Sequence, residues 1–235
     1  EYLISIIYCK IKKIDIFLDI EDSPRSDEKG LNPMINYLFF LAFNKFLFKN
    51  YICASSHIFN SISKYNKKIL YYGSIDNFQK SDKVHEKINV LYSGTINSQT
   101  GIELFKELIF SLNQNSKFEE INSKLNFIIS GNIAENVSIE DLNQFDNFQN
   151  CLYLHKEEYK KKLKKIHIAL NLRDPSSDIN QTTFPSKIID YLSNEIHIIS
   201  SSNNDLKSFG LENSIFFINS YNVDEIIFQL YNYIE

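Results

Sequence analysis

Residues 167–200 read HIALNLRDPSSDINQTTFPSKIIDYLSNEIHIIS, and this stretch decides the fold. It begins and ends with short apolar runs, HIALNL at 167–172 and IHIIS at 196–200, which predict buried strands. Between them lie a polar loop and then the helical pattern SKIIDYLS at 186–193. Two strands joined through a helix pair in parallel, so the stretch predicts one βαβ unit of an α/β fold.

The same alternation of strand and helix patterns continues along the chain. Strands are predicted at residues 14–18, 51–55, 68–72, 89–93, 125–130, 151–154, 167–172, 196–200 and 215–218. Helices are predicted at residues 36–48, 59–64, 101–113, 138–144, 156–165, 186–193 and 223–233. Several of the strands are apolar on both faces, as the buried strands of a parallel sheet are. We therefore expect open parallel sheets covered by helices.

The polar segment DNFQKSDKVHEK, at residues 76–87, is typical of a linker between domains. It separates three early strands from the rest, so we place a boundary near residue 85 and expect domains at 1–85 and 86–235. A doubly wound domain usually contains about five or six strands. Because the first domain has fewer and the chain begins at Glu1 without methionine, we expect an N-terminally truncated fragment.

Composition and spacing argue against several classes of protein. The net charge of −4 disfavours a nucleic-acid binder that neutralises phosphates, so no nucleic-acid partner is expected. Cys9, Cys53 and Cys151 lack the spacing of a disulfide framework or a zinc site, and the histidines lack metal-ligand spacing. No secretory signal is visible, and we expect a cytoplasmic protein.

Two stretches raise the question of contact with a membrane. The longest apolar run, YLFFLAFNKFLF at residues 37–48, is too short to span a bilayer and contains Asn44 and Lys45. We favour a core helix, with an amphipathic helix at the inner face of the membrane as the alternative. The lysine-rich stretch at residues 160–165 is interpreted as a solvated helix face, with acidic lipid as the minor alternative.

Ligands of open parallel sheets bind beyond the carboxyl ends of the strands. Three predicted strands lead into residues suited to such a site, namely SGT at 93–95, SGN at 130–132 and RD at 173–174. The sequence therefore places a candidate site along this edge of the second sheet.

The helix that FPSK opens, at residues 184–187, is the most suggestive element. Its first N–H groups would face a diphosphate with partial positive charge, and Lys187 adds a full charge beside them. Pro185 and Ser186 suit the first helical positions. Asp190 follows Ser186 on the same face, where its carboxylate could accept hydrogen bonds from a ribose. The other interpretation is a capped surface helix with an exposed lysine and aspartate.

The succession of these motifs resembles a known family. The chain is similar to the C-terminal domain of family 4 glycosyltransferases of the GT-B fold, more narrowly those from bacterial surface-polysaccharide clusters. The similarity lies in the order of a strand, SGT, a helix beginning at Gly101, SGN, NLRDP, TFPSKIIDYLS and IHIIS. The resemblance covers residues 88–235, and extends more faintly to FLDIEDS at 17–23, YICASS at 51–56 and ILYYGSID at 69–76.

This resemblance implies a fold and an activity. The fold would be α/β GT-B, with two Rossmann-like domains built on parallel sheets and an incomplete N-terminal domain. The chain would be a glycosyltransferase of the hexosyltransferase type, with a nucleotide-diphosphate sugar as donor and a glycan or lipid-linked glycan as acceptor, acting in polysaccharide synthesis. Retention of anomeric configuration is implied, as is the absence of an obligatory metal or other cofactor.

The resemblance also implies roles for individual residues. Lys187 and Arg173 would be catalytic, because they would stabilise the negative charge of the departing diphosphate. The alternative for Arg173 is a surface ion pair with Asp174 or Asp178, which would contribute little energy. Asp190 would take the place of the family's ribose-binding glutamate. The expected donor-binding residues are Gly94, Thr95, Gly131, Phe184, Pro185, Ser186, Lys187 and Asp190. No metal ligand is expected.

The chain departs from the family pattern at three positions. Thr95 and Thr100 stand where the family often has an arginine and a lysine that bind phosphates. Thr182, eight residues before Asp190, stands where the family has a sugar-side acid, although Asp178 could approach from the loop. Two alternatives therefore stay open: an inactive or partial subunit that binds a nucleotide sugar or a partner enzyme, and a GT-B nucleotide-sugar epimerase or hydrolase.

Overall fold

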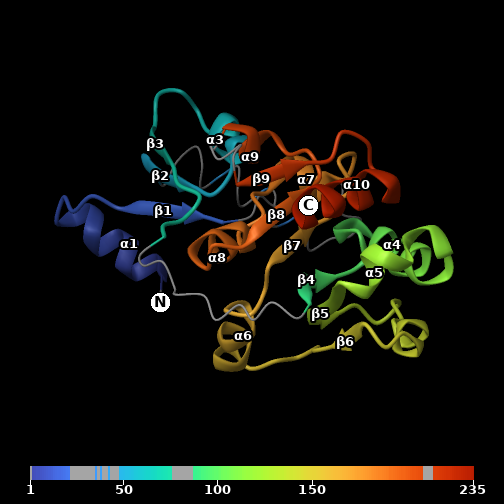
Figure 1. The fold of residues 1–235 in the computed structure, drawn as a ribbon. Coiled ribbons are helices and arrows are strands. Elements are labelled where there is room, and N and C mark those ends of the chain that lie inside the picture. Colours follow the sequence, from blue (N-terminus) through green and yellow to red (C-terminus); the bar gives the residue numbers. More distant parts are fainter. Residues whose placement is uncertain are drawn as a thin grey trace. The chain divides into compact units, whose positions relative to one another are not determined.

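The computed structural model describes residues 2–21, 48–75, 87–208 and 214–235, together with residues 35, 38 and 42 (Figure 1). The chain divides into two compact units. The first consists of Glu1–Gly73 and Thr182–Phe184, and the second of Ser74–Gln181 and Pro185–Glu235. The division falls after Gly73, whereas the boundary predicted near residue 85 lies outside the described residues.

The first unit is built on a small parallel sheet. Its described elements are α1 (Tyr2–Ile11), β1 (Phe17–Ile20), β2 (Asn50–Cys53), α3 (Ser56–Ser61) and β3 (Lys67–Leu70), with the strands in the order β1-β2-β3. Tyr51 and Ile58 are fully buried in its core. Ser55 caps α3, since its hydroxyl accepts a hydrogen bond from the amide of Ile58. The helix predicted at residues 36–48 lies almost entirely outside the described residues.

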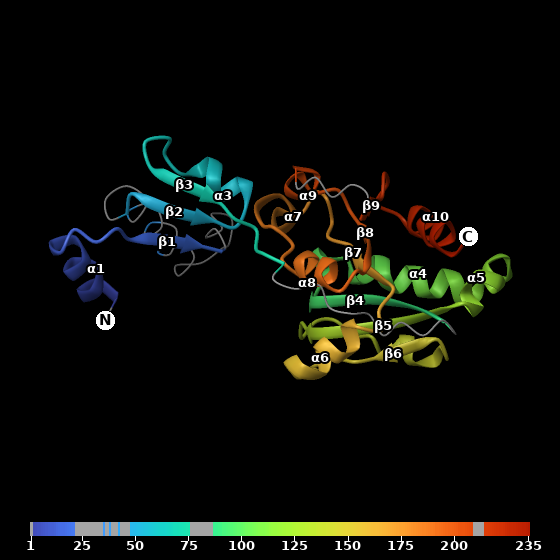
Figure 2. The same cartoon turned by 60° about the vertical axis from the view of Figure 1, so that its left-hand side comes forward.

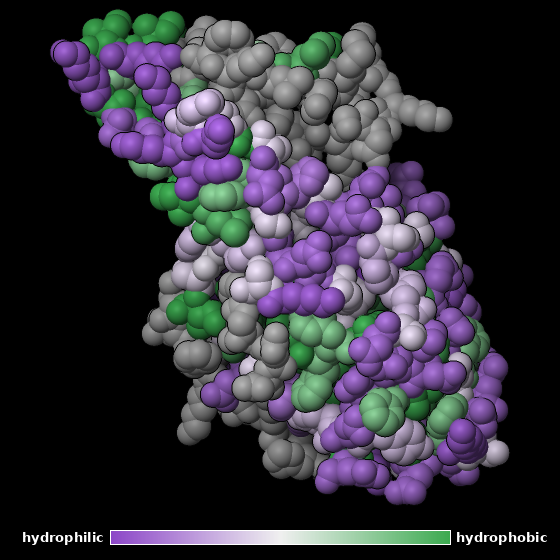
Figure 3. Space-filling view, turned by 90° about the horizontal axis from the view of Figure 1, so that it is seen from above, coloured by the Kyte–Doolittle hydropathy of each residue, from purple (hydrophilic) through white to green (hydrophobic). Residues whose placement is uncertain are grey.

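The α1 helix was not predicted from the sequence, because YLISIIYCKI is apolar without a clear helical period. Three of its isoleucines, Ile4, Ile7 and Ile11, are at least half exposed. On the face that Figure 3 shows, apolar and polar side chains are intermixed over the described residues.

The second unit is a wholly parallel six-stranded sheet in the order β6-β5-β4-β7-β8-β9. The strands are β4 (Ile88–Ile96), β5 (Leu125–Ile133), β6 (Phe148–Asn150), β7 (Ile168–Asn171), β8 (His197–Ser200) and β9 (Ile215–Phe217). The helices are η2 (Ser98–Thr100), α4 (Ile102–Gln114), η3 (Ser116–Phe118), α5 (Glu119–Ser123), η4 (Glu140–Gln144), α6 (Lys156–Leu163), α7 (Asp178–Thr182), α8 (Lys187–Ser193), α9 (Asn204–Ser208) and α10 (Val223–Ile234). From β4, the strands β5 and β6 extend the sheet on one side, and β7, β8 and β9 extend it on the other. The strand order therefore reverses at β4, which is the switch point of the sheet.

The main core lies between this sheet and the helices α4 and α10, which lie side by side in both ribbon views (Figures 1 and 2). Apolar residues recur at helical spacing in α4, so one face of the helix is buried. The ring of Phe105 on this face stacks on Tyr92 at a centroid distance of 4.7 Å and meets Phe127 edge-on at 6.3 Å. Burial of each such side chain contributes about 1.5–3 kcal/mol.

Two predicted elements are displaced by about three residues, since the strand predicted at 14–18 is β1 and the helix predicted at 59–64 is α3. Two others differ in kind. The strand predicted at 151–154 is wrong, because the strand is β6 and residues 151–154 form a turn. Tyr153 has a φ of 57°, in the left-handed region, and the amide of Leu152 donates to the side chain of Asn150. The helix predicted at 138–144 is a shorter 3₁₀ helix, and Ser138 accepts from the amide of Glu140 rather than capping an α-helix.

Candidate functional site

The carboxyl ends of β4 and β5 form the floor of the candidate site. The strands run side by side in register, with Ser93 opposite Ser130 and Gly94 opposite Gly131. The φ angles of Gly94 and Gly131 are 137° and 135°, values that residues with a side chain rarely adopt. Gly131 packs against the backbone of Gly94, and Gly94 lies at the end of β4, where the order of the sheet reverses.

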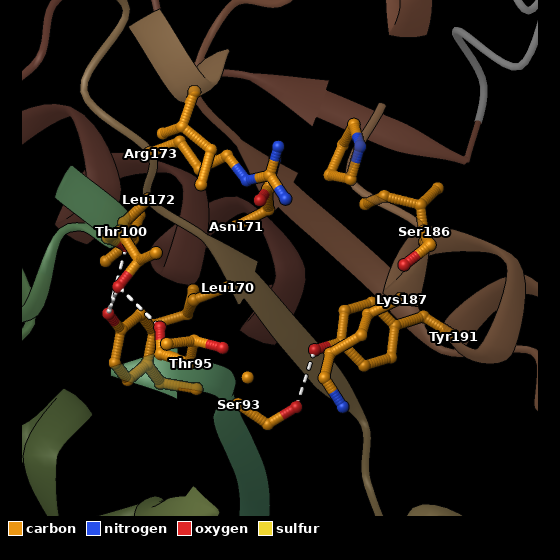
Figure 4. A pocket seen from close by; sticks show the side chains of 15 residues that line it. Ser93, Thr95, Thr100, Leu170, Asn171, Leu172, Arg173, Ser186, Lys187 and Tyr191 are labelled. Atoms are coloured by element: carbon orange, nitrogen blue, oxygen red, sulfur yellow. Dashed lines mark hydrogen bonds between the residues drawn. The ribbon is translucent and has the colours of Figure 1, made fainter. Parts of the chain in front are cut away.

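A cavity of about 190 Å³ lies above this floor (Figure 4). The end of β4, the segment after β7 and the start of α8 surround it. Six of the residues predicted to act in the site line this one cavity: Gly94, Thr95, Arg173, Pro185, Ser186 and Lys187. The sequence therefore identified both charged residues of its lining, Arg173 and Lys187.

Lys187 lies between Gly94 and helix α6. A Cβ atom at Gly94 would meet Cε and Cδ of Lys187 at 3.6 Å and 3.7 Å, so the aliphatic chain rests over the glycine. The ammonium group donates to the hydroxyl of Tyr159 at 3.4 Å and lies 4.5 Å from the centroid of that ring. In the described part of the chain, Lys187 forms no ion pair with a carboxylate. Its charge is therefore available to an anionic ligand.

A half-buried cluster of hydroxyls supports this arrangement and was not predicted. The hydroxyl of Ser93 lies 2.9 Å from that of Tyr159 and 2.8 Å from that of Tyr191. Tyr191 is only 1% exposed, and its burial raises the pKa of the phenol well above its usual value, so the phenol stays protonated. In the sequence, Tyr191 occupies an apolar position of IIDYLS. The available signal was that a buried tyrosine needs a partner for its hydroxyl.

Arg173 and Asp174 follow β7. Arg173 lines the cavity, and its carbonyl accepts a hydrogen bond of 2.5 Å from the hydroxyl of Ser201. The carboxylate of Asp174 accepts from the hydroxyl of Ser176 at 2.7 Å and from its amide at 2.8 Å. These two bonds lower the pKa of Asp174 and close a turn after Arg173.

The start of α8 is less open than expected. The amides of Ile188 and Ile189 donate to the carbonyls of Pro185 and Ser186, so these two N–H groups already have partners. Ser186 makes no capping bond with its side chain, although it occupies the N-cap position. A ligand at this end of α8 would therefore meet the charge of Lys187 more than the amides of Ile188 and Ile189.

Three predicted donor-binding residues lie outside the first cavity. Gly131 lines an adjoining cavity of about 370 Å³, which shares Gly94, Thr95 and Lys187 with the first. Asp190 lines a third cavity of about 700 Å³, beside the lysines of α6. Phe184 is buried and belongs to the first unit.

Thr95 and Thr100, which stand where the family often has an arginine and a lysine, make hydrogen bonds within the second unit. The hydroxyl of Thr100 donates to the carbonyl of Thr95 at 2.8 Å, and the hydroxyl of Tyr92 donates to the carbonyl of Thr100 at 2.9 Å. Thr100 therefore fixes the end of β4 to η2. The positive charge at the cavity comes from Lys187 and Arg173 instead.

The described residues contain neither a candidate metal site nor a helix suited to cross a membrane. No group of His, Cys, Asp and Glu side chains in this part of the chain is arranged to hold a metal ion. None of the helices described here combines the length and the apolar character that a membrane crossing requires.

Comparison with solved structures identifies the fold. No protein-family model matches the sequence, and no curated protein matches it either. Anabaena Alr3699/HepE in complex with UDP-glucose superimposes with a TM-score of 0.70 at 12% identity, over 99% of this chain and 66% of that one. The pneumococcal O-GlcNAc transferase GtfA, in complex with UDP and GlcNAc, gives 0.62 at 11% identity, over 97% of this chain and 46% of that one.

A third structure is a single C-terminal domain. The C-terminal domain of a glycosyl transferase group 1 family protein, LpcC from Francisella tularensis, gives a TM-score of 0.52 at 10% identity, over 69% of this chain and 87% of that one. These proteins are GT-B glycosyltransferases, and the predicted α/β GT-B fold is confirmed. The chain spans just under two thirds of the length of HepE.

Proposed function

We propose that this protein is a glycosyltransferase that moves a sugar from a nucleotide-diphosphate sugar to a hydroxyl of a glycan or lipid-linked glycan. The observation that carries the proposal is the position of Lys187. It lies over Gly94 at the switch point of a GT-B sheet and pairs with no carboxylate of the described residues. HepE and GtfA, which share the fold, were solved with UDP or a UDP-sugar.

The charges at the cavity fit the chemistry of this reaction. When the acceptor oxygen bonds to the anomeric carbon, the bond from that carbon to the diphosphate breaks and negative charge builds up on the leaving group. Lys187 and Arg173 line one cavity and would stabilise that charge. Retention of anomeric configuration and independence from a metal belong to the same proposal, as does a place in polysaccharide synthesis on the cytoplasmic side of a membrane.

The adjoining cavities suggest how the donor would lie. Gly94, Thr95 and Lys187 line both the first and the second cavity, and Tyr159 lines both the second and the third. A donor whose diphosphate contacts Lys187 would reach the first and second cavities, because Lys187 lines both, and Gly131 lines the second. A ribose contact with Asp190 would require the sugar of the nucleoside to reach the third cavity, between α6 and α8.

Calorimetric titration with UDP, GDP and their sugar conjugates tests the proposal. We expect the purified protein to bind one of them, and Lys187→Ala to bind it at least about 10-fold more weakly, because a hydrogen bond to a charged group contributes about 1.5–3 kcal/mol. Lys117→Ala is the control, since Lys117 lies on η3, before β5 begins. If the protein binds none of these nucleotides, the proposal is wrong.

A catalytically inactive, nucleotide-sugar-binding subunit is the second candidate. The neutral side chains of Thr95 and Thr100, where the family often has cations, favour it. Incubation with the donor that binds, followed by detection of released nucleoside diphosphate, separates the two. Release of the diphosphate supports the transferase, whereas tight binding without release under all acceptors tried supports the subunit.

A further inference from the structure

We infer that Tyr159, on α6, is a positioning residue that holds the ammonium group of Lys187 in place for the donor diphosphate. The inference rests on the proposed function, because it assigns Tyr159 a role at that same site. Tyr159 is the side chain that α6 contributes to Lys187, through a hydroxyl 3.4 Å from Nζ and a ring whose centroid lies 4.5 Å from it.

The hydroxyl of Tyr159 is itself fixed from two other elements. It lies 2.9 Å from the hydroxyl of Ser93 on β4, and Ser93 lies 2.8 Å from the hydroxyl of Tyr191 on α8. Tyr191 follows Lys187 by one helical turn, so α8 carries both the cation and the inner end of this chain of hydroxyls. Figure 4 shows the bond from Ser93 to Tyr191 beside the side chain of Lys187.

A phenol suits this task better than a carboxylate would. A carboxylate beside Lys187 would orient the ammonium group but would also offset the charge that the diphosphate needs. The neutral hydroxyl of Tyr159 accepts one hydrogen bond from Lys187 and leaves the charge and the other N–H donors for the ligand. Because a free lysine side chain has many rotamers, holding it in place before the ligand binds lowers the entropy lost on binding.

A double-mutant cycle with UDP as the probe tests this role. Tyr159→Phe removes the hydroxyl and keeps the ring over Lys187. We expect Tyr159→Phe to weaken UDP binding about 3- to 10-fold, the range of a single net hydrogen bond. In a Lys187→Ala background, the same substitution should change the dissociation constant less than about 2-fold, because the residue it positions is gone. Tyr65→Phe, at a side chain 87% exposed, is the control.

The outcomes separate this inference from the proposed function. If the unmutated protein binds neither UDP nor GDP, both the proposed function and this inference are overturned; if it binds GDP and not UDP, the cycle is run with GDP. If Lys187→Ala weakens binding and Tyr159→Phe does not, only the positioning role is wrong. A loss from Tyr159→Phe that persists in the Lys187→Ala background also overturns it, since Tyr159 would then act on its own.

A second variant covers a failure of Tyr159→Phe to fold, which a thermal melt would reveal. Ser93→Ala breaks the same chain of hydroxyls from β4 and leaves the contact of Tyr159 with Lys187 possible. We expect Ser93→Ala to weaken UDP binding when Lys187 is present, and to cause no further loss in the Lys187→Ala background. Equal losses with and without Lys187 would overturn the inference.

Discussion

Gly131 lies directly opposite Gly94 in the β4–β5 ladder, so closely that a Cβ atom on Gly131 would overlap the carbonyl oxygen of Gly94. The contact is with backbone, which cannot turn aside as a side chain can. Gly131 also has a φ of 135°, which disfavours any residue with a side chain. Because Gly131 has no Cβ atom, the backbone of Gly94, which lines the candidate site, can lie against it.

Gly131→Ala is therefore expected to be strongly destabilising. Backbone strain costs about 1–3 kcal/mol and overpacking about as much again, so we expect the free energy of unfolding to fall by about 2–6 kcal/mol. Urea denaturation followed by circular dichroism measures it. Asn132→Ala, at the next and exposed position of β5, is the control and should change it by less than about 0.5 kcal/mol. A Gly131→Ala protein as stable as this control would contradict the prediction.

Phe105→Ala tests the core beneath the site. Phe105 is fully buried on α4 and joins the rings of Tyr92 on β4 and Phe127 on β5. We expect a loss of about 3–5 kcal/mol in the free energy of unfolding, as for other buried phenylalanines. Chemical denaturation checks it, with Glu107→Ala on the exposed face of α4 as the control. A loss below about 1 kcal/mol would mean that Phe105 does not tie the helix to the sheet.

Tyr191→Phe tests how much the hydroxyl cluster of Ser93, Tyr159 and Tyr191 contributes to the stability of the protein. The variant keeps the ring and removes one hydrogen bond to Ser93, whose hydroxyl still has Tyr159 as a partner. We expect a loss of about 1 kcal/mol, the usual net value of a hydrogen bond. Differential scanning calorimetry measures the change. Tyr153→Phe, at a side chain 63% exposed, should leave the melting temperature unchanged, and equal effects of the two substitutions would contradict the prediction.

The sequence predicted the βαβ unit at residues 167–200 because its signals are local. Apolar runs, a polar loop and a helical period appear within 34 residues, and β7, α8 and β8 lie where these patterns indicate. The strand predicted at 151–154 shows the limit of such patterns. CLYL is apolar enough for a strand, but Tyr153 adopts a left-handed backbone that composition does not reveal.

The candidate site was predictable only in its charged and glycine residues. Lys187, Arg173 and Gly94 follow strands or open a helix, and the rule for parallel sheets places such residues at one edge. Tyr159 and Ser93 are 66 residues apart, and Ser93 and Tyr191 are 98 apart, so their contacts depend on the packing of three elements. A single sequence holds no periodic signal for contacts at such separation.

The alkaline stability of the protein should depend in part on Tyr221. Its hydroxyl donates to the carbonyl of Leu172 at 2.8 Å, and the side chain is 37% exposed. Partial burial, with the nearby charge of Asp174, raises the pKa of Tyr221 from 10.0 to about 12. The folded protein therefore keeps the phenol protonated after the unfolded chain has begun to lose the proton. This contribution to stability is complete below pH 10 and is lost as the pH rises from 10 to about 12.

Urea denaturation at pH 8, 9, 10 and 11 measures the stability of the protein and of Tyr221→Phe. The lysines titrate in both proteins, so their effect cancels in the difference between the two stabilities. At pH 8 we expect the variant to be less stable by about 1 kcal/mol, the value of the lost hydrogen bond. Above pH 10 the difference should shrink, because only the unmutated protein has this phenol to ionise on unfolding. A difference that stays constant from pH 8 to pH 11 would show that Tyr221 titrates alike in both states and would contradict the prediction.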